Sequence, residues 1–282
     1  MTTCFLNGKY LDLEDAKISV LDRGFVFGDA VYEVLTSHGR KIFGLNEHLA
    51  RLEQSLSEVS IRSPMSRDSW CAVLEKLIFL HANMDLSLYI QVSRGVAPRS
   101  HTFPKDIEPT VFIMCQVIEQ VNDLSKVSCI TLTDNRWGRC DIKTTSLLPN
   151  LLLKNTAINR GAHEAILIRD GYVTEGASSN VFIVKDEKIF TSPTSKHTIL
   201  PGVTRKLICD VAHSIGIDYM ERQVSQNELL SADEIWLTSS TSDIVAVSVL
   251  DKVPVGKDFT YPFGQRVYEA FNDYKRGNSL SF

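Results

Sequence analysis

Long apolar runs are missing from the sequence. The longest, Val111–Cys115, is far shorter than the ~20 residues that a membrane-spanning helix requires. The first residues also show no basic start followed by an apolar stretch, so we expect no secretory signal and no membrane segment. These features predict a cytoplasmic protein.

Charge of neither sign dominates, and the cysteines are scattered. The 282 residues include 30 Lys and Arg against 34 Asp and Glu, which gives a formal charge of −4. With a net charge this close to zero, the sequence shows no excess of basic residues that would indicate binding to nucleic acid or to an anionic membrane. None of the six cysteines forms a Cys-x-x-Cys pair or stands at zinc-ligand spacing from a histidine, so we expect reduced thiols and no metal site.

Glycine-rich nucleotide motifs are absent as well. There is no Gly-x-Gly-x-x-Gly and no P-loop, which argues against a nucleotide enzyme. The composition is that of an ordinary globular protein, with 44% hydrophobic and 23% charged residues, and the length suits two domains. Hairpin signals such as Asn7-Gly8 alternate with isolated helical stripes such as Leu49, Leu52 and Leu56. We therefore expect an α+β protein and not a doubly wound sheet.

A polar stretch from Glu119 to Lys126 lies between two strand-like runs. Polar segments that few contacts cross are where domain boundaries usually fall. We predict an N-terminal domain over residues 1–118, a linker over 119–126 and a C-terminal domain over 127–282.

Four segments hold polar and charged residues that a hydrophobic core cannot use. They are Asp22–Glu33, Arg94–His101, Trp137–Ser146 and Thr174–Asn180. Each has a structural explanation when it is taken singly, because loop cations are usually solvated and runs of Ser and Gly are typical of plain turns. Taken together and in this order, the four segments indicate a functional site.

In these segments the sequence resembles the class IV aminotransferases, the fold-type IV enzymes that use pyridoxal phosphate, and among them the D-amino acid aminotransferases. The resemblance runs from about Phe5 to Val255. Its most specific matches are the blocks 139–143 (Arg-Cys-Asp-Ile-Lys) and 175–180 (Glu-Gly-Ala-Ser-Ser-Asn), while the loop with Arg99 and His101 separates this subfamily from its relatives. The resemblance implies a small N-terminal α/β domain and a larger C-terminal pseudo-barrel domain that binds the cofactor.

The resemblance also implies a role for each matching residue at the cofactor, pyridoxal 5′-phosphate. Lys143 would condense with the cofactor aldehyde, which requires its neutral amine, and would later carry the proton released from the substrate. Glu175 would face the pyridine nitrogen and keep it protonated. The phosphate is expected among a guanidinium group, helix N-terminal amides and hydroxyl groups. The remaining cofactor residues would be Arg51, Ser178, Ser179, Val203, Thr204, Ser240 and Thr241.

Tyr32, Arg99 and His101 match the residues that hold the substrate carboxylate in the D-amino acid aminotransferases. A guanidinium group suits this task because it can give a carboxylate two parallel hydrogen bonds. A carboxylate held there would aim the α-hydrogen of a D-amino acid at Lys143. In the family the loop comes from the neighbouring subunit, so the resemblance implies a homodimer.

The expected function is therefore transamination of D-amino acids, of the D-alanine type, with 2-oxoglutarate, giving a 2-oxo acid and D-glutamate. Alternatives of the same fold are a branched-chain L-amino acid aminotransferase, an R-selective amine transaminase and an aminodeoxychorismate lyase. A non-catalytic protein that binds pyridoxal phosphate is the alternative from another class. Phe25, Val26 and Ala30 differ from the residues that close relatives often carry. The sequence therefore does not predict which side chain of the substrate amino acid the pocket prefers.

Overall fold

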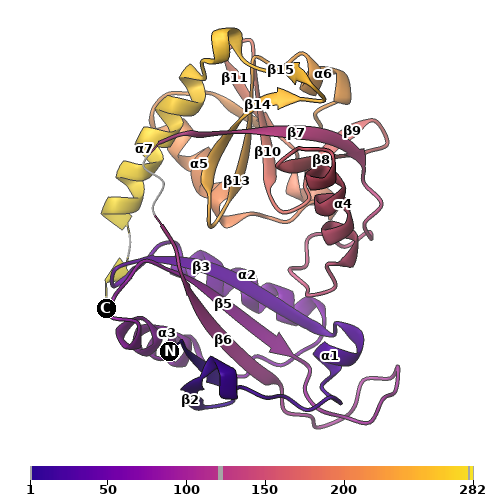
Figure 1. Cartoon of the computed structure of the whole chain (residues 1–282), viewed down its shortest axis with the longest axis vertical. Helices are drawn as coiled ribbons and strands as arrows, with labels where there is room; N and C mark the ends of the chain where they lie inside the picture. The colour runs from indigo at the N-terminus through magenta and orange to yellow at the C-terminus, as the bar shows by residue number, and fades with distance from the viewer. Residues whose placement is uncertain (1, 120–122, 279, 282) are drawn as a thin grey trace. The chain divides into compact units, whose positions relative to one another are not determined.

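The computed structural model describes residues 2–119, 123–278 and 280–281, and these residues form two compact units (Figure 1). Unit 1 holds the described residues up to 119, the short segment Ile142–Ser146 and the C-terminal end of the chain. Unit 2 holds the other described residues. The boundaries expected from the sequence stay a prediction, and residues 120–122 of the expected linker lie outside the described residues.

Unit 1 is built on an antiparallel sheet of seven strands in the order β16-β4-β3-β5-β6-β1-β2. Its strands are β1 (Thr3–Leu6), β2 (Lys9–Asp12), β3 (Ala30–His38), β4 (Lys41–Ile42), β5 (Leu86–Ser93), β6 (Thr110–Val117) and β16 (Leu280–Ser281). Its helices are the 3-10 turn η1 (Leu13–Asp15), α1 (Arg23–Phe27), α2 (Leu45–Glu58) and α3 (Arg67–Leu80). The predicted hairpin joins β1 to β2, and both turn residues, Asn7 and Gly8, adopt the positive φ that such a turn needs.

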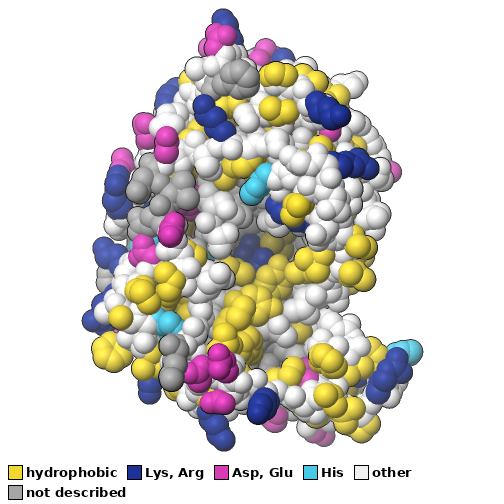
Figure 2. Space-filling view, in the orientation of Figure 1, with side chains coloured by type: hydrophobic (Ala, Val, Ile, Leu, Met, Phe, Trp, Pro, Cys, Tyr) yellow, Lys and Arg dark blue, Asp and Glu magenta, His cyan; other side chains and the backbone are white. Residues whose placement is uncertain are grey.

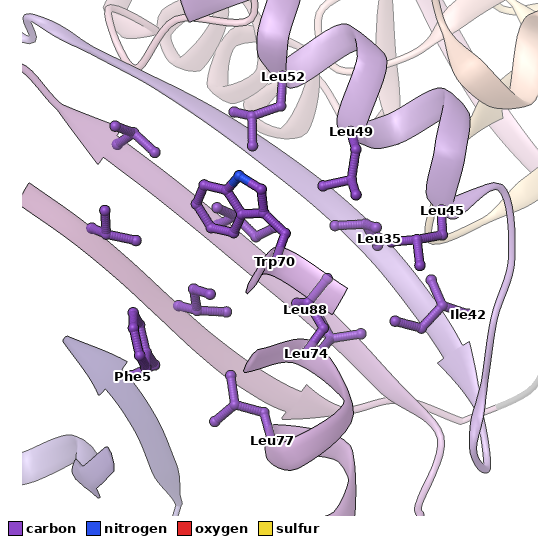
Figure 3. Packing of buried hydrophobic residues seen from close by; sticks show 14 of the residues in the cluster. Phe5, Leu35, Ile42, Leu45, Leu49, Leu52, Trp70, Leu74, Leu77 and Leu88 are labelled. Atoms are coloured by element: carbon purple, nitrogen blue, oxygen red, sulfur yellow. The ribbon is translucent and has the colours of Figure 1, made fainter. Parts of the chain in front are cut away.

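The core of unit 1 lies between one face of this sheet and the helices α2 and α3. The leucines of the predicted helical stripe, among them Leu49 and Leu52, meet Trp70 and Leu74 of α3 over the sheet residue Leu35 (Figure 3). Side chains alternate between the two faces of a strand, so residues two apart share a face. The other face of β3 and β5 is thereby left for polar and aromatic side chains.

Unit 2 is built on a mixed sheet of nine strands in the order β12-β11-β10-β13-β14-β7-β8-β9, with β15 paired to β14. Its strands are β7 (Ser125–Thr133), β8 (Glu164–Arg169), β9 (Tyr172–Gly176), β10 (Asn180–Lys185), β11 (Lys188–Thr191), β12 (Tyr219–Glu221), β13 (Glu234–Ser239), β14 (Asp243–Leu250) and β15 (Val253–Pro254). Its helices are α4 (Leu148–Asn159), η2 (Thr194–Lys196), α5 (Val203–Ser214), α6 (Gln226–Leu230), η3 (Lys257–Phe259) and α7 (Pro262–Asn278). The sheet curls on itself, because β9 at one end of this order also contacts β10 near the middle (Figure 1).

The chain returns from unit 2 to unit 1 over the short segment Ile142–Ser146. A β-bridge joins Val31 to Thr144, and the Tyr32 N–H donates to the carbonyl of Lys143 at 2.9 Å. Ile142 is buried in the core of unit 1. These contacts place the backbone of Lys143 against β3.

Within the described ranges, no helix is both long and apolar enough to span a membrane. The same residues contain no group of three or more His, Cys, Asp or Glu side chains that could hold a metal ion.

Candidate active site

Lys143 lies in unit 1, in the segment that runs along the edge of β3 beside Val31 and Tyr32. Its backbone N–H donates to the hydroxyl of Ser55 at 3.3 Å, in addition to the carbonyl contact with β3. Its side chain is half-buried, with Nζ 4.3 Å from the centroid of the Tyr32 ring. The structure thus brings together two predicted residues, the amine and Tyr32, which are far apart in the sequence.

The face of the sheet that carries the Tyr32 ring also carries two residues that were not expected at the site. The ring of Tyr89 stacks on that of Tyr32, with 5.6 Å between centroids, and its hydroxyl donates to Gln91 at 2.7 Å. Burial raises the pKa of Tyr89 to about 12, so its hydroxyl keeps its proton. The signal for both residues was the period-two alternation of strand β5, which places Tyr89 and Gln91 on the face away from the core.

Arg51 is buried on α2 and is paired with a carboxylate that is fully shielded from solvent. Its Nε and Nη2 donate to the two oxygens of Glu33, at 3.0 and 2.7 Å. Nδ1 of His48 lies 3.1 Å from the same carboxylate. Burial opposes the charge of Glu33, but Arg51 and His48 outweigh it and hold its pKa below the ordinary value. The hydrogen bonds to Glu33 fix the position of the Arg51 guanidinium group. This is the group that the sequence predicts to bind the cofactor phosphate.

Arg99 and His101 lie on the long loop between β5 and β6, and both are exposed. Figure 2 shows basic and histidine side chains gathered at the outer tip of this loop, at the lower right. Phe27 lies beneath both residues, 5.2 Å from the Arg99 guanidinium carbon and 5.8 Å from the centroid of the His101 ring. The two predicted carboxylate-binding residues therefore share one aromatic support.

Glu175 lies in unit 2, at the end of β9, and is buried. One of its oxygens accepts from Arg136 at 2.5 Å, and the other accepts from the Asn180 amide at 3.1 Å and from the Leu200 N–H at 2.9 Å. Burial raises the pKa of its carboxyl to about 7, against the opposing charge of Arg136. The buried Asp134 holds Arg136 in turn with two hydrogen bonds of 2.9 Å.

Arg136 and Asn180 both bind the Glu175 carboxylate, and the sequence analysis gave neither of them a role. Arg136 stands one residue before the third polar segment, and Asn180 closes the fourth. The amide of Asn180 donates both to Glu175 and to the Leu200 carbonyl, so it ties the end of β9 to the loop before α5. A Cβ atom at Gly202 would lie 2.0 Å from Oδ1 of Asn180, which explains why this position carries glycine.

Ser178 and Ser179 form the tight turn between Glu175 and Asn180. Their hydroxyls donate to the buried carboxylate of Glu164, at 2.6 and 3.5 Å. Nζ of Lys154 lies 3.3 Å from the same carboxylate. The hydroxyls therefore brace the turn that follows the Glu175 strand.

The predicted anion-binding groups of unit 2 lie at the start of α5 and in one strand connection. Val203 and Thr204 are the first residues of α5, and the N-cap, Gly202, gives the helix no side-chain hydrogen bond. Ser240 and Thr241 lie in the turn between β13 and β14, where they are half-buried and exposed, respectively. A helix start whose amides have no side-chain cap is well suited to an anion.

These groups fit the cofactor that the motifs predict. Pyridoxal 5′-phosphate needs an amine for its aldehyde, a carboxylate for its ring nitrogen and donors for its phosphate. Among the predicted residues, unit 1 contains Lys143 and Arg51, and unit 2 contains Glu175 and the start of α5. The buried Glu175, whose burial favours a proton, is suited to share that proton with a ring nitrogen.

Comparisons with known proteins agree with the motifs. The family model described as amino-transferase class IV matches residues 30–250. The D-alanine aminotransferase of Bacillus licheniformis is 38% identical over 269 residues, which are 95% of each chain. The D-alanine aminotransferase of Staphylococcus haemolyticus is 36% identical over 282 residues, 99% of this chain and 100% of that one.

A branched-chain amino acid aminotransferase from Escherichia coli has a similar structure. Its TM-score is 0.91 at 24% identity, and the match covers 99% of this chain and 96% of that one. At this identity the likeness concerns the fold alone, and it confirms the α+β fold expected from the sequence.

Proposed function

Because this chain belongs to the class IV amino-transferase family, we propose that it transfers the amino group of a D-amino acid, of the D-alanine type, to 2-oxoglutarate. The products are a 2-oxo acid and D-glutamate. The observation that carries the proposal is the 38% identity to a D-alanine aminotransferase across 95% of both chains. A cytoplasmic location stays a prediction.

Pyridoxal 5′-phosphate, the cofactor of the family, supplies when bound an aldehyde for the amino group and a ring that takes up electrons from the substrate α-carbon. We assign the covalent attachment to Lys143, whose amine then moves the proton at the substrate α-carbon. Glu175 holds the proton on the ring nitrogen. Arg51 and the first amides of α5 bind the phosphate, together with the hydroxyls of Ser240 and Thr241, and Ser178 and Ser179 support the ring from their turn.

Tyr32, Arg99 and His101 bind the substrate carboxylate in this proposal. The assignment of Tyr32 is supported by its position beside Lys143, whose Nζ lies 4.3 Å from the centroid of the Tyr32 ring. Because Arg99 and His101 are exposed at a loop tip, we propose that this loop completes the active site of a second copy in a homodimer. Exposed apolar side chains on the loop and on α1, such as Phe103 and Phe25, support burial against a partner.

Complementation between two defective variants tests the shared site. Lys143→Ala would be inactive and Arg99→Ala would turn over D-alanine poorly, but a mixed dimer would hold one site with both residues intact. Unfolding and refolding the two variants together is expected to raise the activity at low D-alanine concentration well above that of either variant. If the mixture is no more active than its components, the loop serves its own subunit and the proposed arrangement is wrong.

A substrate panel tests the activity itself. Both enantiomers of alanine, glutamate and leucine are assayed with 2-oxoglutarate, and D-alanine is expected to react faster than L-leucine. Reaction of the L-amino acids alone would favour the branched-chain alternative. Absence of turnover with a bound cofactor would favour the non-catalytic binding protein.

A further inference from the structure

The segment Asp22–Glu33 carries a buried charge cluster that the proposed function does not use. Asp29 lies between two arginines: Nε of Arg23 donates to it at 2.7 Å, and Nε and Nη2 of Arg94 donate to it at 2.8 and 2.9 Å. Both arginines are 4% exposed. Burial disfavours the carboxylate, but the two guanidinium groups hold the pKa of Asp29 below its ordinary value.

The remaining donors of the two arginines bind backbone carbonyls on either side of the cluster. Nη1 of Arg23 donates to the Ser100 carbonyl at 2.6 Å and reaches the Thr102 carbonyl at 3.5 Å. Arg94 donates to the carbonyls of Val59 and Ser60, just after α2, at 2.7 and 2.9 Å. Two arginines and one carboxylate leave an excess positive charge, which these carbonyl dipoles stabilise.

Aromatic rings extend the cluster to the tip of the loop. Phe103 lies 3.6 Å from the Arg94 guanidinium carbon, within the range of a cation–π contact. Phe27 lies 4.8 Å from the Arg23 guanidinium carbon, and it is the same ring that supports Arg99 and His101. Arg23 thus contacts both the backbone on each side of His101 and the ring beneath it.

Backbone contacts bring the two segments close together at the base of the loop. The Arg23 N–H donates to the Gly95 carbonyl at 2.9 Å, and the Arg94 N–H donates to the Asp29 carbonyl at 3.1 Å. Gly95 has a φ of +110°, and a Cβ there would lie 2.1 Å from the Glu108 carbonyl oxygen. The loop leaves β5 along a path that another residue would block.

We propose that Arg23, held by the Asp29 carboxylate that Arg94 also binds, is the positioning residue of the loop that binds the substrate carboxylate. It fixes the carbonyls of Ser100 and Thr102 and the ring of Phe27, and so sets where Arg99 and His101 present their charge. This inference rests on the proposed function of that loop. It also explains why the segment Asp22–Glu33 combines glycines, aromatic residues and paired charges.

Steady-state kinetics of the assembled, cofactor-loaded enzyme test the inference, because a positioning role should change KM and leave kcat nearly the same. Arg23→Gln is expected to raise the KM for D-alanine roughly ten-fold or more, because charged hydrogen bonds to the loop are lost. The kcat and the visible absorbance of the bound cofactor are expected to change little. A merely structural role would lower the melting temperature and the active fraction and leave KM unchanged.

Arg62→Gln is the matched control, because Arg62 forms an exposed ion pair with Glu108 near the other end of the same loop. A folded Arg23→Gln enzyme whose KM equals that of Arg62→Gln would overturn the inference. Should Arg23→Gln fail to fold, Phe27→Leu removes the ring beneath Arg99 and His101. It is expected to raise KM several-fold, and an unchanged KM there would overturn the inference as well.

Arg99→Ala separates this inference from the proposed function. An increase of KM in Arg99→Ala without one in Arg23→Gln would contradict only the positioning role. An unchanged KM in both variants would contradict the proposed carboxylate site itself.

Discussion

Glu175 and Arg136 meet at 2.5 Å in the interior of unit 2, and the second oxygen of Glu175 accepts from Asn180 and from the Leu200 N–H. Both oxygens of the carboxylate are therefore fixed before any cofactor binds. Fixed charge aimed at a reacting group is effective because it needs no reorganisation during the reaction. This arrangement supports the role that we propose for Glu175 at the ring nitrogen.

Glu175→Gln is expected to lower kcat for D-alanine by on the order of a hundred-fold or more, because a neutral amide cannot keep the ring nitrogen protonated. The variant should still bind the cofactor through Lys143. Steady-state kinetics and the visible spectrum check the two statements separately. Glu187→Gln, at an exposed turn position, is the control. Near wild-type kcat in Glu175→Gln would contradict the role.

The raised pKa of Glu175 predicts how the stability of the cofactor-free protein depends on pH. Its folded value of about 7 lies above its ordinary value of 4.5, so between these values the folded state holds a proton that the unfolded state has lost. The contribution of Glu175 to stability is therefore fully present below pH 4.5 and is lost as pH rises through 7. Urea unfolding across this range should show a smaller pH dependence in Glu175→Gln, and equal slopes would contradict the prediction.

The buried carboxylate of Glu33 predicts the opposite dependence. Its folded pKa lies below its ordinary value of 4.5, so its contribution to stability is present above that value and is lost as pH falls through the folded pKa. Glu33→Gln is expected to lower the free energy of unfolding at pH 7 by roughly 3–5 kcal/mol, because it leaves the Arg51 guanidinium buried without its counter-charge.

Glu53→Gln provides a matched control on the same helix as Arg51. Its carboxylate pairs with Arg67 at 2.7 Å, but both side chains are more than 40% exposed. Exposed pairs contribute at most about 1 kcal/mol, so this variant should be far less destabilised than Glu33→Gln. Similar unfolding free energies for the two variants would show that the buried Glu33–Arg51 pair contributes no more to stability than the exposed Glu53–Arg67 pair.

Arg99→Ala is expected to lower kcat/KM for D-alanine by about thirty-fold or more, a loss of roughly 2–5 kcal/mol. The cause would be an unpaired substrate carboxylate in a site closed by the partner. The visible absorbance of the bound cofactor should be unchanged, since Arg99 is not among the cofactor residues. An unchanged KM, measured by steady-state kinetics, would show that Arg99 does not bind the carboxylate.

Short sequence patterns predicted individual helices and hairpins, whereas the candidate site depends on contacts between residues that are far apart in the sequence. The Asn7-Gly8 hairpin and the leucine stripe of α2 follow from turn chemistry and from helical spacing, which involve only near neighbours in sequence. The pairing of Arg136 with Glu175 joins a residue of the connection after β7 to a residue of β9, and no local pattern specifies it. Strand order and register in a curled sheet are set by packing across the whole unit.

The alternation of β5 shows where more could have been predicted. The sequence indicated a strand with two different faces, and Tyr89 and Gln91 occupy the face that carries Tyr32. The neighbour relation could not be read from the sequence, because it depends on β3 pairing with β5 in one particular register. The role of Arg23 was hidden for the same reason, since its partners Ser100 and Thr102 lie on another loop.

The most direct test is the visible spectrum and activity of Lys143→Ala after reconstitution with pyridoxal 5′-phosphate. Lys188→Ala, which removes an exposed lysine, is the control. We expect Lys143→Ala to lose both the visible absorbance of the covalently bound cofactor and the transamination of D-alanine, with Lys188→Ala unchanged. Retained absorbance in Lys143→Ala, with borohydride fixing the cofactor to another lysine, would contradict the assignment of Lys143.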